Sequence, residues 1–119
     1  MTLGLLLAPD AETDIDEILG WSVEKFGADV RDGYEELIGT TIERLLIDPE
    51  HPITRERPEL GRGIRVVHLR SCRDSVRTGV RRIRDPRHFV VYRRVGDVVQ
   101  VVRVLHDAMD LPRHRILPG

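Results

Sequence analysis

The stretch HFVVYRRV-GD-VVQVVRVL, residues 88–105, decides the fold class of this chain. Two runs rich in β-branched and aromatic residues flank Gly96-Asp97, a dipeptide that favours the tight turn of a two-residue β-hairpin. The sequence therefore predicts two neighbouring antiparallel strands, His88–Val95 and Val98–Leu105.

A two-residue turn also divides the side chains of this hairpin between two faces, because successive strand residues point to opposite sides. One face holds Phe89, Val91, Val98, Val102 and Val104, with Arg93 and Gln100 near the turn. The other holds His88, Val90, Tyr92, Arg94, Val99, Val101, Arg103 and Leu105. We predict that the first face packs against helices and that the second is an open binding face. A one-residue bulge would exchange these assignments.

The first half of the chain has helical periodicity. Leu3–Leu7 is a short apolar run that Pro9 ends, which indicates a strand. Asp10 is a candidate N-cap for a helix through Phe26, and a second helix is expected over Asp29–Asp48. Gly27 leaves room only for a short turn, so the two amphipathic helices should form an antiparallel hairpin. The expected apolar stripes are Ile15, Ile18, Leu19, Ser22 and Phe26 in the first helix, and Val30, Tyr34, Leu37, Ile38, Thr41, Leu45 and Leu46 in the second.

The middle of the chain connects the helices to the hairpin. Residues 49–63 contain several prolines and two glycines and are expected to be a loop. Ile64–Arg70 should be a strand, and Ser71–Gly79 a helical turn or a bulging loop. The predicted order is β-α-α-β-β-β in a single domain, residues 1–119, with a final helical turn near Met109. This is an α+β fold, a mainly antiparallel sheet covered on one face by the helical hairpin.

Charge is distributed unevenly along the chain. Residues 1–50 carry three basic and thirteen acidic side chains, and residues 51–119 carry sixteen basic and seven acidic ones. The net charges of these halves are therefore −10 and +9, although the whole chain has a net charge of only −1. This asymmetry favours an anionic partner, either an acidic peptide or nucleic acid. Alternatively, both charged faces are simply solvated.

Several classes of protein and site are disfavoured by the sequence. The apolar runs are too short for a membrane span, and Leu3–Pro9 is a poor secretory signal. Cys72 is the single cysteine, so no intramolecular disulfide can form, which suits a reducing cytoplasm. The five histidines lack the spacing of a metal site, and no Gly-rich phosphate loop is present. We expect neither a metal nor a cofactor.

The last third of the chain carries a recognisable signature. Pro86–Arg93 is followed by Val101–Leu111 and then by Arg113-His114. The same order of motifs occurs in the ParE branch of the RelE/ParE toxin superfamily, which this chain resembles over nearly its whole length. Further matching positions are Ala8-Pro9, Ile18–Ser22, Phe26-Gly27, Tyr34 and Gly63-Ile64-Arg65. Ser71–Val80 departs from the resemblance, because this segment is longer than in the compact members.

The resemblance implies a cytoplasmic bacterial toxin of a type II toxin–antitoxin system. A ParD-like antitoxin with an acidic amphipathic tail would hold it inactive, and the free toxin would poison DNA gyrase without being an enzyme. Neither membrane association nor sequence-specific binding of nucleic acid is implied. Sister branches of the superfamily are ribosome-dependent messenger RNA ribonucleases, so ribonuclease activity is the alternative, and the fold alone does not decide between them.

Candidate site residues follow from the face assignment and the resemblance. For binding the antitoxin or the target they are Arg65, His88, Tyr92, Arg94, Arg103 and His106. A ribonuclease would use His106, Tyr92 and Arg103 for acid–base chemistry and phosphate binding. Two structural alternatives stay open. His106 would only make local hydrogen bonds at the strand end, and Arg103 would pair with an internal acid such as Asp107 or Asp110.

Overall fold

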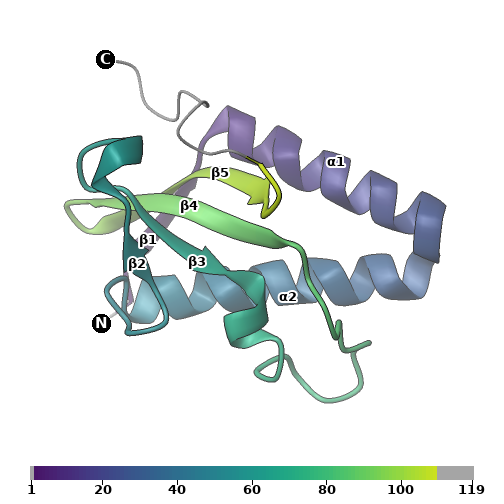
Figure 1. The fold of residues 1–119 in the computed structure, drawn as a ribbon. Helices are drawn as coiled ribbons and strands as arrows, with labels where there is room; N and C mark the ends of the chain where they lie inside the picture. The colour runs from purple at the N-terminus through teal and green to yellow at the C-terminus, as the bar shows by residue number, and fades with distance from the viewer. Residues whose placement is uncertain (1, 110–119) are drawn as a thin grey trace.

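A computed structural model of the protein describes residues 2–109 and shows two helices packed on one face of a five-stranded sheet (Figure 1). The elements are β1 (Gly4–Leu7), α1 (Pro9–Phe26), α2 (Ala28–Ile47), β2 (Arg55–Glu56), η1 (Pro58–Leu60), β3 (Arg65–His68), η2 (Leu69–Cys72), β4 (His88–Val95) and β5 (Val98–His106). The strand order is β1-β5-β4-β3-β2; β1 runs parallel to β5, and every other pair is antiparallel. The predicted α+β class is confirmed.

The chain passes directly from β1 into α1. The backbone N–H of Ala8 still donates to Val101 O in β5 (2.9 Å), and Pro9 is the first helical residue. Pro suits this position because its fixed φ is helical and its missing N–H would have had no partner in the helix. The expected N-cap at Asp10 is therefore wrong, since Asp10 lies inside the first turn.

The helices form the predicted antiparallel hairpin. Gly27 joins them with a φ of 90°, a conformation that other residues rarely adopt. The buried core beneath the helices includes Ala11, Ile18, Leu19, Tyr34, Leu37, Ile38, Ile42 and Leu45. Phe26 was expected in this stripe, but 58% of its surface is exposed, because it is the last residue of α1 and lies at the tip of the hairpin.

The middle segments contain more structure than expected. β2 and η1 lie within residues 49–63, which were predicted to be a loop, and β2 forms the edge of the sheet beside β3. The strand predicted over Ile64–Arg70 is shorter, because the helical turn η2 begins at Leu69. At the other end, the N–H of Met109 donates to His106 O (3.1 Å), which makes a turn, and residues 110–119 lie outside the described part.

A strap, residues 73–87, runs from η2 along α2 to β4 (Figure 1). Arg81 Nη1 bonds to Asp29 Oδ2 (3.0 Å), and Arg77 Nε bonds to Glu36 Oε1 (2.8 Å), so the strap is anchored to α2 at two points. A Cβ on Gly33 would overlap the carbonyl oxygen of Arg81. This close approach explains why a glycine occupies the middle of α2, where it weakens the helix.

The β4–β5 hairpin has the predicted two-residue turn and also a bulge. Val95 pairs with Val98, and the pairing continues in register to Tyr92 and Val101. The next pair is Val91 with Arg103, so Val102 has no partner in β4. This extra residue shifts the register of everything beyond it by one position.

The face assignment of the hairpin was therefore largely wrong. The residues that pack under the helices are Val90, Tyr92, Val99, Val101 and Val104. On the opposite face, Phe89, Val91, Val102 and Leu105 form a second cluster with Leu60, Ile64 and Val66. Only the sides of Val104 and Leu105 were predicted correctly among these, because both follow the bulge. The loop around η1 covers part of the face that was expected to be open.

Candidate functional site

A groove opens between the tip of the helical hairpin and the ends of β4 and β5. Its volume is about 550 Å³. We call it the helix-side groove; it is lined by Asp14, Glu17, Ile18, Trp21, Ser22, Phe26, Val30, Tyr34, Ile83, Asp85, Arg87, His88, Arg103, Val104, Leu105, His106 and Met109. The lining thus comes from α1, α2, the strap and both hairpin strands. Three of the predicted binding residues, His88, Arg103 and His106, meet here.

Aromatic residues form the rim of the groove at the hairpin tip. The rings of Trp21 and Phe26 pack edge to face with their centroids 5.3 Å apart. Their exposed fractions are 49% and 58%, which is high for side chains of this size. An exposed apolar patch beside a groove is typical of a protein-binding surface.

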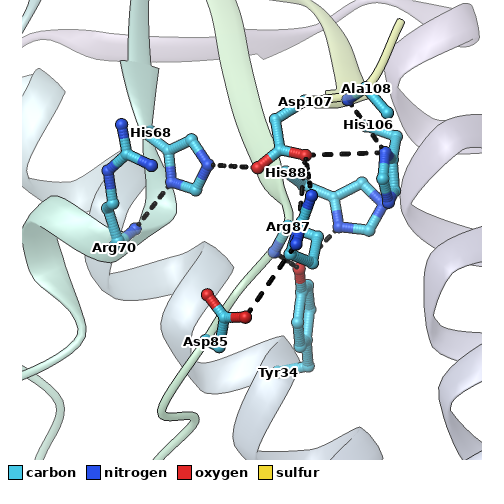
Figure 2. A network of polar contacts seen from close by, with 9 residues as sticks. All are labelled: Tyr34, His68, Arg70, Asp85, Arg87, His88, His106, Asp107 and Ala108. Carbon is cyan, nitrogen blue, oxygen red and sulfur yellow. Dashed lines mark hydrogen bonds and ion pairs between the residues drawn. The ribbon is translucent and has the colours of Figure 1, made fainter.

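A chain of hydrogen bonds forms the floor of the groove (Figure 2). The Tyr34 hydroxyl accepts from the backbone N–H of Arg87 (3.1 Å) and lies 2.5 Å from His88 Nδ1. Within residues 2–109, Nδ1 of His88 is its one acceptor, so the hydroxyl donates to this atom. The proton of the neutral imidazole is then on Nε2.

Burial keeps both members of this pair uncharged. It raises the pKa of the Tyr34 hydroxyl to about 12. Burial, together with the neighbouring His106, lowers the pKa of His88 to about 4. At neutral pH the floor of the groove is therefore polar but carries no charge at these two residues.

His106 lies beside this pair and is more exposed. Its ring meets that of His88 edge to face at a centroid distance of 5.1 Å, and the N–H of Ala108 donates to its Nδ1 (3.0 Å). The hydrogen bond with Ala108 is the local interaction foreseen at the strand end. Because Nδ1 is occupied as an acceptor, the available nitrogen of neutral His106 is an Nε2–H donor.

Asp107 connects the end of β5 with β3 and with the strap (Figure 2). Its carboxylate bonds to His68 Nε2 in β3 (3.0 Å) and forms an ion pair with Arg87 Nη2 in the strap (3.1 Å). Burial by itself raises the pKa of Asp107, but the hydrogen bonds from His68 and Arg87 outweigh it and bring the pKa below its ordinary value. These contacts fix the end of β5, where His106 projects into the groove.

Arg103 pairs with an acid that the sequence reading did not identify. Arg103 Nε and Nη2 donate to the two carboxylate oxygens of Asp14 in α1 at 2.7 and 2.9 Å. The backbone N–H of Val104 also donates to Asp14 (2.9 Å). This hydrogen bond with Asp14 raises the pKa of Arg103. Asp14 thus accepts the backbone N–H at the edge of β5 beyond the end of β1. The structure shows the alternative in which Arg103 pairs with an internal acid, but the acid is Asp14 and not Asp107; Asp110 lies outside the described residues.

The other predicted binding residues, Arg65, Tyr92 and Arg94, line a separate hollow of about 440 Å³. Tyr92 is fully buried and its hydroxyl donates to Pro49 O (2.5 Å), so its expected place on an open face is wrong. Arg65 Nη2 donates to Thr54 Oγ1 (2.8 Å) and Arg94 Nε to Gly96 O (2.8 Å). The three residues considered for ribonuclease chemistry therefore do not share one site: His106 and Arg103 line the helix-side groove, and Tyr92 lines the separate hollow.

Several groove residues were missed by the sequence reading. Tyr34 was assigned to an apolar stripe, and neither Trp21 nor Asp14 was among the candidate site residues. Helical spacing predicted the burial of Tyr34 but could not pair its hydroxyl with His88, 54 positions away. Within residues 2–109, no group of three His, Cys, Asp or Glu side chains is arranged to hold a metal ion. Among the same residues, no helix is long and apolar enough to cross a bilayer.

Comparison with known proteins agrees with this fold. The family described as "ParE toxin of type II toxin-antitoxin system, parDE" matches residues 5–111. Toxin ParE1 of Mycobacterium tuberculosis is 30% identical over 117 residues, which cover 96% of this chain and 99% of the relative. Toxin ParE1 of Caulobacter vibrioides is 30% identical over 108 residues, covering 91% and 93%.

A solved structure, "Chromosomal ParDE TA system from P. aeruginosa", superimposes with a TM-score of 0.62 at 16% identity. The match covers 88% of this chain and 96% of that chain, so the likeness extends over the whole fold. The family match and the two sequence relatives identify this chain as a member of the ParE toxin family of type II toxin–antitoxin systems.

Proposed function

We propose that a ParD-like antitoxin neutralises this toxin by packing an amphipathic segment into the helix-side groove. The related structure from P. aeruginosa is that of a ParDE system, which supports a partner of this kind. The observation that carries the proposal is the exposed pair Trp21 and Phe26 at the rim of the groove. Large aromatic side chains contribute most to binding when a partner covers them completely.

The groove also changes the expected contribution of charge. An acidic antitoxin tail was expected to face Arg65, Arg94 and Arg103, but Arg103 is paired with Asp14, and the other two line a different hollow. The carboxylates of Glu17 and Asp85 also line the groove. Binding in the groove itself should therefore depend on apolar contacts more than on acidic residues of the partner.

We further infer that the free toxin acts in the cytoplasm by binding and poisoning DNA gyrase rather than by catalysis. The resemblance to ParE toxins implies a gyrase poison, and the three residues that a ribonuclease would need are divided between the helix-side groove and the hollow lined by Tyr92. A general acid and a phosphate ligand must converge on one reacting group, and Tyr92 is buried elsewhere.

Expression of the chain alone tests both parts of the proposal. Growth should stop with filamentation and a DNA-damage response, purified toxin should inhibit gyrase supercoiling, and messenger RNA should stay intact. Co-expression with the antitoxin encoded beside the toxin should restore growth. Discrete cuts in translated messages that disappear in His106→Ala would instead establish the ribonuclease alternative.

Trp21→Ala tests the groove directly. We expect it to weaken antitoxin binding by about 2 kcal/mol, roughly 30-fold, because a rim aromatic loses its contact area. Ile47→Ala is a matched control, since Ile47 is 68% exposed at the other end of the helical hairpin and should leave affinity unchanged. Equal affinities for the wild type and Trp21→Ala, measured by calorimetry, would show that the antitoxin docks elsewhere.

A further inference from the structure

Another hollow, distinct from the helix-side groove and from the hollow lined by Tyr92, lies on the face of the sheet opposite the helices. Arg55 in β2 pairs with Val66 in β3, and His68 in β3 pairs with Phe89 in β4. Directly paired strand residues point to the same side, and Val66 and Phe89 belong to the cluster on the face away from the helices. These four side chains therefore share that face.

The hollow is strongly basic. We call it the basic hollow; it has a volume of about 520 Å³ and is lined by Pro52, Ile53, Arg55, Arg57, Val66, His68, Arg70, Ser71 and Phe89. No carboxylate appears among these lining residues. Arg57 is paired with Glu59, but within residues 2–109 neither Arg55 nor Arg70 has an ion-pair partner. Two exposed guanidinium groups are thus available to an anion.

The hollow is also built on well-positioned residues. His68 Nε2 bonds to Asp107, and His68 Nδ1 accepts from the backbone N–H of Arg70 (3.1 Å), so the His68 ring and the Arg70 backbone are held in place (Figure 2). Phe89 is half-buried, because its ring packs against Leu105 and its neighbours while part of it faces the hollow. An aromatic ring that shares a sheet surface with arginines can stack with a planar ligand.

We propose that the basic hollow binds the backbone of single-stranded nucleic acid, with Phe89 stacking against a base. Arg55 and Arg70 would contact successive phosphates, and binding would release counterions and depend steeply on salt. An acidic peptide would satisfy the arginines but would make no use of the aromatic ring. The contact reads no base edges, so it agrees with the expectation of no sequence-specific binding. The basic hollow lies outside the helix-side groove, so this proposal does not depend on the proposed antitoxin contact.

Fluorescence anisotropy with the full-length protein tests this proposal. The probes are a labelled 12-nucleotide oligothymidylate, a DNA duplex of the same length and a labelled polyglutamate peptide. We expect the single strand to bind most tightly. Arg55→Ala and Arg70→Ala should each weaken it about 3- to 10-fold at 0.1 M salt and reduce the salt slope by roughly one ion. Phe89→Leu should weaken it about 5- to 30-fold with little change in slope.

Two further variants keep the result interpretable. Arg77→Ala removes the same charge from the strap, where Arg77 pairs with Glu36, and should not change binding. Phe89→Trp keeps an aromatic ring and should retain or strengthen binding, so it covers the case in which Phe89→Leu does not fold.

Three outcomes would overturn the proposal. Equal losses in Arg77→Ala and Arg55→Ala would mean that only net charge matters. A duplex bound as tightly as the single strand would exclude stacking on Phe89. Polyglutamate bound more tightly than the oligonucleotide would identify the hollow as a site for an acidic protein segment.

Discussion

The helix-side groove and the basic hollow have similar volumes, about 550 and 520 Å³, but opposite chemistry. The groove has aromatic and aliphatic walls, an uncharged floor of Tyr34 and His88, and carboxylates among its lining residues. The hollow has three arginines, one aromatic ring and no lining carboxylate. The first suits an amphipathic protein segment and the second a polyanion.

This difference arises within two adjacent residues of one strand. His88 lines the groove and Phe89 lines the hollow, because successive side chains of β4 point to opposite faces of the sheet. Helices cover the first face, so the histidine there is buried and neutral. On the second face, Arg55, Arg57 and Arg70 line the basic hollow. One short sheet thereby presents two unrelated surfaces.

The largest effect that we predict is a loss of folding stability at low pH, caused by His88 on the helix-covered face. The pKa of His88 is about 4 in the folded protein and near 6.5 when unfolded, so the unfolded chain binds more protons between these values. Stability should therefore fall as pH drops from 6.5 toward 4, by about 3 kcal/mol in total. Urea denaturation at a series of pH values measures this loss. In His88→Gln the loss between pH 6.5 and 5 should be much smaller, and equal losses would show that other groups cause it.

Asp14→Ala should have the next largest effect. It removes the acceptor for Arg103 and for the N–H of Val104, and we expect a loss of about 2–3 kcal/mol, the range for hydrogen bonds to a charged group. Chemical denaturation checks this value, and Asp14→Asn should lie between Ala and the wild type. An unchanged midpoint in Asp14→Ala would mean that water replaces the carboxylate. Nucleic-acid binding at the basic hollow should persist in whatever fraction stays folded.

Tyr92→Phe should have the smallest effect and tests the hollow that contains Arg65 and Arg94. It removes the hydrogen bond to Pro49 O at a cost of about 1 kcal/mol, a typical value for a single neutral hydrogen bond. Because Tyr92 is buried, toxicity and antitoxin affinity should match the wild type in growth and binding assays. If a stable Tyr92→Phe variant lost toxicity or antitoxin affinity, Tyr92 would be a binding residue after all.

Three of the six residues predicted to bind a partner lie together in the helix-side groove, and their binding role stays a prediction. His88, Arg103 and His106 line the groove, as expected of residues that interrupt or end apolar strands. The contacts that these residues make could not be predicted from the sequence. The partner of Arg103 lies 89 positions earlier in the chain, and no local pattern connects α1 to the edge of β5.

The sequence by itself determined the helical hairpin, the β4–β5 turn, the order of the main elements and the family. Each of these depends on residues close together in the chain: a period of 3.6 or 2, a turn dipeptide, or a contiguous motif. Only the tertiary structure decided which face of the hairpin meets the helices. A single unpaired residue, Val102, shifts the register beyond it, and its place depends on how the whole core packs.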